Sequence, residues 1–156
     1  MTSSRIAQRC SGVLAALLLV GTAHAQPRQP GWEVTVAERV TVAPGESQSI
    51  SVAIRVDRGL TVSKDASVIV DVQADPGVTV RKKRLGRTDA VDPEADAPRF
   101  AVGVKGDTSG DHAVKVRIRF WVCGGKSCKP VDVRKSATVT VAAPAPVPPP
   151  DAGVGR

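Results

Sequence analysis

The segment HAVKVRIRFWVC, residues 112–123, constrains the fold more than any other part of the sequence. Successive side chains of a β-strand point to opposite faces of its sheet, so residues two apart share a face. One face is then entirely apolar, while the other is largely cationic. The apolar face comprises Val114, Val116, Ile118, Phe120 and Val122, and the other comprises Lys115, Arg117, Arg119, Trp121 and Cys123. We therefore predict a strand whose first face, including Phe120, lies in a core.

Short strands separated by turns account for the rest of the chain between Trp32 and Ala142. This region is rich in Val, Thr and Ile, and the turn segments APGES, DRG, ADPG, GDTSGD and CGGKSC interrupt it at short intervals. No stretch has a helical periodicity of apolar residues. The pattern predicts an all-β domain, either an antiparallel sandwich or a barrel. The expected strands cover residues 33–42, 48–56, 66–72, 78–83, 99–104, 112–123 and 131–141.

The N-terminus has the layout of a cleavable secretory signal. Arg5 and Arg9 precede an apolar run over residues 12–20, and small residues flank His24 in Ala23-His24-Ala25. We expect cleavage after Ala25 and a periplasmic or secreted protein without stable membrane insertion. Cys10 precedes the apolar run, whereas a lipid-attachment cysteine would follow it.

The remaining sequence is long enough for one domain. We expect a short segment over residues 26–31, the domain over 32–142, and a proline-rich tail over 143–156 that is a spacer or disordered. The irregular stretch over residues 81–98 is basic and then acidic, and is either a functional loop or a solvated connection.

Charge and aromatic content argue against nucleic-acid binding. The chain has 22 Lys and Arg against 15 Asp and Glu, and removal of Arg5 and Arg9 leaves 20 against 15, a net charge of +5. These cations are spread along the chain, and its only aromatic types are Trp and Phe, whereas nucleic-acid surfaces cluster charge and stacking rings. We expect no nucleic-acid partner and a monomer. Trp121 is either an anchor for a partner or a cover for its own sheet.

Cys123 and Cys128 are the only cysteines after the signal, and their spacing suits the tip of a hairpin. In an oxidising compartment they are expected to form a disulfide. A bridge that closes so short a loop contributes only about 2 kcal/mol in the entropy model. A metal site would need more ligands, and His112 would lie at the far end of the same strand. We expect no metal and no cofactor.

A redox function for the pair is the third alternative. Lys126, Lys129 and Arg119 could lower the pKa of a thiol, and the glycines at 124 and 125 would leave a sulfur accessible. Glycine and lysine are also ordinary residues of hairpin tips, so a structural staple remains open.

The segment FWVCGGKSCKPVDVRKSATVTV resembles the end of the amino-terminal periplasmic domain of the thiol:disulfide interchange protein DsbD and of the related disulfide bond corrector domains. The order of strands and turns over residues 32–142 is similar to that family, and the cysteine hairpin is its specific part. The resemblance implies an immunoglobulin-like β-sandwich of about seven to eight strands. It also implies that Cys123 and Cys128 are catalytic and exchange reducing equivalents with periplasmic thioredoxin-like proteins.

Two functions follow from these observations. In the first, a partner thiolate attacks one sulfur of the Cys123–Cys128 pair, a mixed disulfide forms, and the second cysteine resolves it, a role that we assign to Cys128. In the second, the chain is a non-enzymatic scaffold or interaction module whose disulfide pins a hairpin. The reduction potential of the pair discriminates between them.

Overall fold

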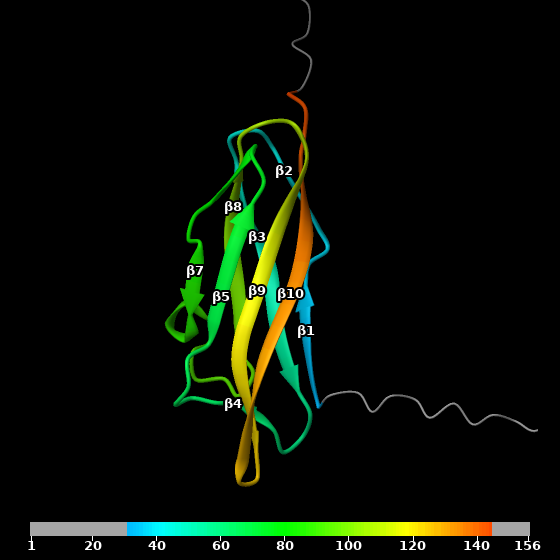
Figure 1. Ribbon diagram of the computed structural model, residues 1–156. Helices are drawn as coiled ribbons and strands as arrows, with labels where there is room; N and C mark the ends of the chain where they lie inside the picture. Colours follow the sequence, from blue (N-terminus) through cyan, green and yellow to red (C-terminus); the bar gives the residue numbers. More distant parts are fainter. Residues whose placement is uncertain (1–30, 145–156) are drawn as a thin grey trace, which may run out of the picture.

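The computed structural model describes residues 31–144 as two β-sheets packed face to face. The expected signal, its cleavage site, Cys10 and most of the proline-rich tail lie outside the described residues. The first sheet has the order β1-β3-β8-β6, and the second has the order β2-β10-β9-β5-β7 with β4 paired to β9 (Figure 1). The strands are β1 Trp32–Val36, β2 Arg39–Val42, β3 Ser47–Val56, β4 Thr61–Val62, β5 Ile69–Ala74, β6 Val78–Val80, β7 Arg84–Gly86, β8 Arg99–Gly106, β9 Gly110–Gly124 and β10 Ser127–Val141, with a 3-10 turn over Arg87–Asp89.

The core lies between the sheets and is formed by alternate residues of the long strands. All five residues of the predicted apolar face of β9 are buried, and Phe120 is 2% exposed. The first sheet contributes Ile50, Val52 and Ile54 from β3 and Phe100, Val102 and Val104 from β8. Trp121, on the opposite face of β9 from Phe120, is 41% exposed. The predicted face assignment of this strand is thus confirmed.

The first expected strand, residues 33–42, is divided between the two sheets. The amide of Ala37 donates to Ser51 O of β3 at 2.9 Å, whereas the amide of Thr138 in β10 donates to Glu38 O at 2.8 Å. The chain therefore leaves β3 and joins β10 between residues 37 and 38. The second half, β2, runs parallel to β10, so the sandwich is not purely antiparallel as expected.

The strand order is that of an immunoglobulin-like sandwich, as the fold prediction proposed. Strands β1, β3 and β8 take the places of A, B and E in one sheet, and β5, β9 and β10 take those of C, F and G in the other. After β5 the chain first forms β6, which pairs with β8 in the first sheet, and then returns to the second sheet to form β7, which pairs with β5. In the usual order the strand beside C comes before the strand that joins the other sheet, so these two short strands are exchanged along the chain.

Two short strands and one turn lie where the sequence predicted only irregular structure. Strand β4 occupies the connection between β3 and β5, and β7 with the turn Arg87–Asp89 occupies part of residues 81–98. Each of these strands has only two or three residues, too few for a two-residue alternation to be recognised. Residues 31–144 contain no helix long and apolar enough to cross a membrane.

Candidate functional site

The two cysteines face each other at the tip of the β9–β10 hairpin, which projects beyond the neighbouring strands (Figure 1). Cys123 and Cys128 are direct partners in the ladder, with Cα atoms 4.0 Å apart, and their sulfurs are bonded. Gly125 has a φ of +61°, and Lys126 has a negative φ. A glycine with positive φ at the first of two central positions is typical of a type II′ hairpin turn. The predicted disulfide is therefore present across a tight turn.

The disulfide lies on the outer face of its sheet. Cys128 is exposed, whereas Cys123 is half-buried because Thr61 of β4 pairs with it on its other side. The next pair on the same face of the hairpin is Trp121 with Pro130. The nearest ladder neighbours of the two sulfurs are thus a hydroxyl, an indole and a pyrrolidine ring, none of which is charged.

The inner side of the hairpin tip packs on Leu60, in the turn before β4. A Cβ atom added to Gly124 would lie 2.3 Å from Leu60 Cδ2, and one added to Gly31 would lie 2.6 Å from Leu60 Cδ1. Leu60 is therefore held between two glycines at the end of the sandwich. A small hollow beside it is lined by Trp32, Val122, Ser127 and Lys129. The glycine at 124, which the sequence suggested would open a sulfur to attack, instead admits this leucine on the other face.

Arg87 positions the strand that flanks Cys123. Its guanidinium donates from Nη1 to Pro93 O and Ala95 O at 2.9 and 3.1 Å, and from Nη2 to Val62 O and Ser63 O, both at 2.9 Å. The amide of Val62 donates in turn to Asp96 O at 2.7 Å. These bonds tie β4 to the loop over residues 90–98. Arg87 carries no recognisable sequence signal, because its partners are backbone carbonyls of two separate segments rather than side chains.

The three cations expected beside the thiols are placed differently from one another. Arg119 donates from Nη2 to Asp71 Oδ2 at 2.7 Å, so its charge is paired two rows away from the disulfide. Lys129 lies on the inner side of the hairpin, where it lines the hollow beside Leu60. Lys126 occupies the turn itself and is exposed. Of the three, Lys126 is thus the cation left at the tip without an acidic partner among the described residues.

His112, the third ligand considered for a metal, lies at the opposite end of β9 from Cys123. Its Nε2 atom is 2.8 Å from Thr108 O, and its ring packs on Gly77, where an added Cβ would lie 2.2 Å from Cε1. Eleven residues of strand separate it from Cys123, a span of tens of ångströms at about 3.3 Å per residue. Within residues 31–144 no group of three His, Cys, Asp or Glu side chains could hold a metal ion.

Comparisons with known proteins show similarity of fold only. No protein-family model matches the chain, and no curated protein sequence matches it. Among solved structures, it is similar to domains 4 and 5 of the S-layer protein SbsC, with 18% identity and a TM-score of 0.40 over 71% of this chain and 51% of the other. The chain thus spans about half the length of that S-layer fragment.

Two further structures are similar over a comparable share of the chain. One is Escherichia coli alpha-2-macroglobulin from domain MG7 to the C-terminus, with 12% identity and a TM-score of 0.44 over 72% of this chain and 17% of that one. The other is murine CRIg, with 10% identity and a TM-score of 0.39 over 72% of this chain and 98% of that one. These superpositions are loose, so the fold assignment rests on the strand order and register of the chain itself.

Proposed function

We propose that this domain is an exported, non-enzymatic interaction module, an immunoglobulin-like scaffold whose disulfide fixes the shape of a projecting hairpin. One observation carries the proposal. Cys123 and Cys128 are direct ladder partners in a hairpin that its own tight turn and Leu60 already hold in place. Their ladder neighbours Thr61, Trp121 and Pro130 are uncharged, and of the three cations expected beside the thiols only the exposed Lys126 lies at the tip without an acidic partner among the described residues. A thiolate is stabilised by nearby positive charge, so this environment favours a staple over a reactive dithiol.

A second candidate, thiol-disulfide exchange of the DsbD type, is favoured by the exposure of Cys128 at the tip of the hairpin. In that reaction a partner thiolate attacks one sulfur, the Cys123–Cys128 bond breaks, and a mixed disulfide forms with release of the other cysteine as a thiolate. A second partner thiolate then displaces the mixed disulfide. The partner dithiol is oxidised, and this pair is reduced by two electrons.

The reduction potential of the pair tests the two candidates against each other. For a structural staple we expect a value below about −300 mV, and no mixed disulfide with periplasmic proteins when either cysteine alone is replaced by serine. The double variant Cys123→Ser with Cys128→Ser is the control for non-covalent capture. A potential near that of glutaredoxins, about −200 to −230 mV, together with a mixed disulfide dependent on one cysteine, would transfer support to the exchange function.

A further inference from the structure

Strand β10 has an open edge along the middle of the second sheet. Its partner on one side is β9 for its whole length, but on the other side β2 pairs only with Thr138 to Val141. Among the described residues no strand covers the edge from Ser127 to Ala137. The free edge of a long strand presents unpaired backbone amides and carbonyls, a template to which another extended chain can add.

The register shows which backbone groups face this opening. In an antiparallel pair, close Cα atoms mark residues that are not hydrogen-bonded to each other, and the 4.0 Å separation of Cys123 and Cys128 identifies such a pair. Counting by two along β10, the amides of Asp132, Arg134 and Ser136 also point away from β9. The next in the series, Thr138, does donate outward, to Glu38 O at 2.8 Å.

Pro130 and β2 set the limits of the opening. Pro130 belongs to the same outward series, and a proline has no amide hydrogen to donate, so strand addition ends there. At the other end, β2 occupies the edge from Thr138 onward. The accessible window is thus residues 131–137, long enough for three outward-directed amides.

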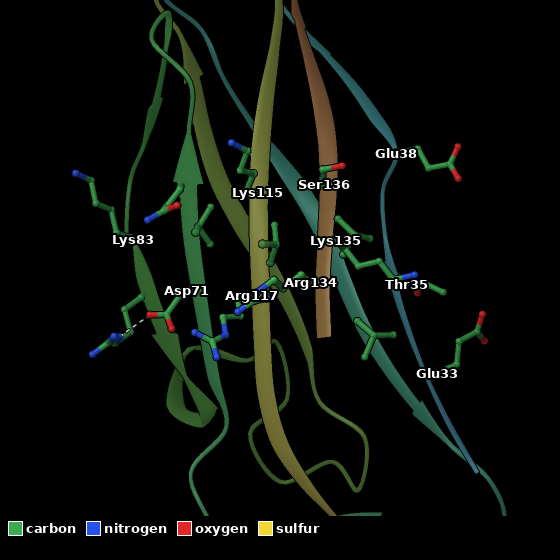
Figure 2. Close-up of a pocket in the computed structure, with 16 residues that line it drawn as sticks. Glu33, Thr35, Glu38, Asp71, Lys83, Lys115, Arg117, Arg134, Lys135 and Ser136 are labelled. Atoms are coloured by element: carbon green, nitrogen blue, oxygen red, sulfur yellow. Dashed lines mark hydrogen bonds and ion pairs between the residues drawn. The ribbon is translucent and has the colours of Figure 1, made fainter. Parts of the chain in front are cut away.

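The outer face beside this window is positively charged. Arg134 lies directly opposite Arg117 of β9, and Lys115 lies opposite Ser136 in the next row. Like charges directly opposite each other destabilise a ladder. Arg117 is the one of these cations that is hydrogen-bonded to an acid, because its Nε donates to Asp132 at 3.0 Å. Figure 2 shows Lys115 and Arg117 on β9 beside Arg134 on β10, lining one hollow to which Glu33, Glu38 and Asp71 also contribute. The charged residues that line this hollow are six basic and three acidic, so its net charge is positive. Lys115 and Arg134 make no ion pair among residues 31–144.

A second copy of the chain is a poor occupant for this edge. Two copies paired edge to edge about a two-fold axis would bring Arg134 and Lys135 of one against the same residues of the other. The cost of like charges in facing positions would oppose that dimer. An acidic strand would instead place negative charges opposite these positive ones.

We propose that the open edge of β10 binds an extended acidic segment of a partner protein, which adds to the sheet as a further strand beside residues 131–137. This inference rests on the proposed interaction function and names its partner. The outer-facing side chains of the added strand are acidic and lie against Arg134, within the net positive charge of the hollow. Its alternate side chains face a second hollow between β1 and β10, which is lined by the apolar Trp32, Val34, Val56 and Val133 and by the charged Glu33, Arg55, Asp57 and Lys135. The two acidic and two basic residues there balance in charge, so these alternate side chains are uncharged.

A nine-residue peptide that alternates glutamate and valine, with blocked termini, is a direct probe. Titrated into the oxidised full chain, it is expected to slow amide hydrogen exchange at Asp132, Arg134 and Ser136, measured by NMR. The same peptide N-methylated at its glutamates keeps the charge but loses the hydrogen bonds, and one with glutamine in place of glutamate keeps the hydrogen bonds but loses the charge. Both are expected to bind at least tenfold more weakly.

Variants of the chain test the edge from the protein side. Arg134→Glu is expected to weaken peptide binding at least tenfold. Lys105→Glu makes the same change of charge at an exposed residue of β8 in the other sheet, and should leave peptide binding unchanged. Ser136→Pro removes one outward amide, as Pro130 already does in the same strand, and should abolish the protection. If that variant does not fold, the N-methylated peptide gives the same answer.

Several outcomes would overturn the proposal. They are equal binding of the N-methylated peptide, binding without protection of the three amides, no binding of the acidic peptide, or protection of the edge by dimerisation without peptide. Tighter binding of heparin without amide protection would make the surface a site for anionic polymers instead. Each outcome is measured on oxidised protein, so it is independent of whether the disulfide exchanges with partner thiols.

Discussion

The carboxylate of Asp71 is shared by two arginines from neighbouring strands. Arg84 Nε of β7 donates to Asp71 Oδ1, and Arg119 Nη2 of β9 donates to Oδ2, each at 2.7 Å. The carboxylate thus connects three strands on the outer face of the second sheet. The hydrogen bond from Arg84 is the largest influence and lowers the pKa of Asp71; burial opposes it, and the hydrogen bond from Arg119 adds to the lowering, so that the pKa lies below its ordinary value.

This arrangement predicts a pH-dependent contribution to stability. Because the pKa of Asp71 is lower in the folded chain than in the unfolded one, the contribution is complete above the unfolded pKa of about 4 and is lost as the pH falls through the folded pKa. Asp71→Asn should therefore reduce the free energy of unfolding at pH 7, and the difference from the wild type should vanish in strong acid. Its size should be less than about 1 kcal/mol, since both arginines are partly exposed.

Asp65→Asn is the matched control, because it removes the same charge from an exposed aspartate that makes no ion pair within residues 31–144. Urea unfolding of the three proteins at several pH values provides the measurement. A difference between Asp71→Asn and wild type that grew on acidification would contradict the assignment.

Adjacent residues of β9 should differ strongly in their contribution to stability. Phe120 is 2% exposed and meets Trp32 edge to face, with ring centroids 5.9 Å apart. Phe120→Ala should cost about 3 to 5 kcal/mol, enough to unfold a marginal domain. Arg119→Ala breaks a partly exposed ion pair on the other face and should cost less than about 1 kcal/mol. Equal losses in urea unfolding would mean that the faces of the strand are assigned incorrectly.

The long strands could be predicted from sequence because alternation is a local property. Between Val114 and Val122 every second residue is large and apolar, so the alternation identifies both the strand and its buried face. The cysteine pairing was predictable for a similar reason, since the tight turn brings Cys123 and Cys128 together by itself.

Features that depend on contacts between distant segments could not be predicted in this way. Nothing in the local sequence at Ala37 and Glu38 indicates that the chain changes sheets there, because the change depends on β3 and β10. Arg87 donates to the carbonyl of Ala95, 8 residues along the chain, and to that of Val62, 25 residues away on β4. The open edge of β10 is likewise a consequence of how short β2 is.

The contact between Leu60 and Gly124 predicts a steric effect at the hairpin tip. Gly124→Ala would place a methyl group 2.3 Å from Leu60 Cδ2, so the leucine must move, with an expected cost of about 1 to 3 kcal/mol. Leu60→Ala in the same chain should remove that penalty, so the two changes should be strongly non-additive.

The control for this effect is Gly86→Ala, since a Cβ atom there would meet only Val68 O, at the ordinary distance of 3.9 Å. A double-mutant cycle in urea would measure the coupling. Additive losses for Gly124→Ala and Leu60→Ala would show that the hairpin tip does not pack on the leucine.

The disulfide should be dispensable for folding. Its short closed loop contributes only about 2 kcal/mol, whereas β9 and β10 pair from Gly110 with Val141 to Gly124 with Ser127 and bury a continuous core. The double variant Cys123→Ser with Cys128→Ser should therefore fold with a modestly lower midpoint. Amide exchange should accelerate only near the tip, at Trp121 and in β4, since Thr61 pairs with Cys123.

Wild-type protein reduced with a phosphine is the matched control for the serine variant, because it breaks the same bond without changing the side chains' size appreciably. Both should unfold at the same denaturant concentration and retain binding of the acidic peptide, whose site lies along residues 131–137. A variant that failed to fold would show that the staple is essential to the sandwich. Loss of peptide binding with the fold intact would show that the tip and the open edge act together, because the bond would then fix the course of β10 beyond Pro130.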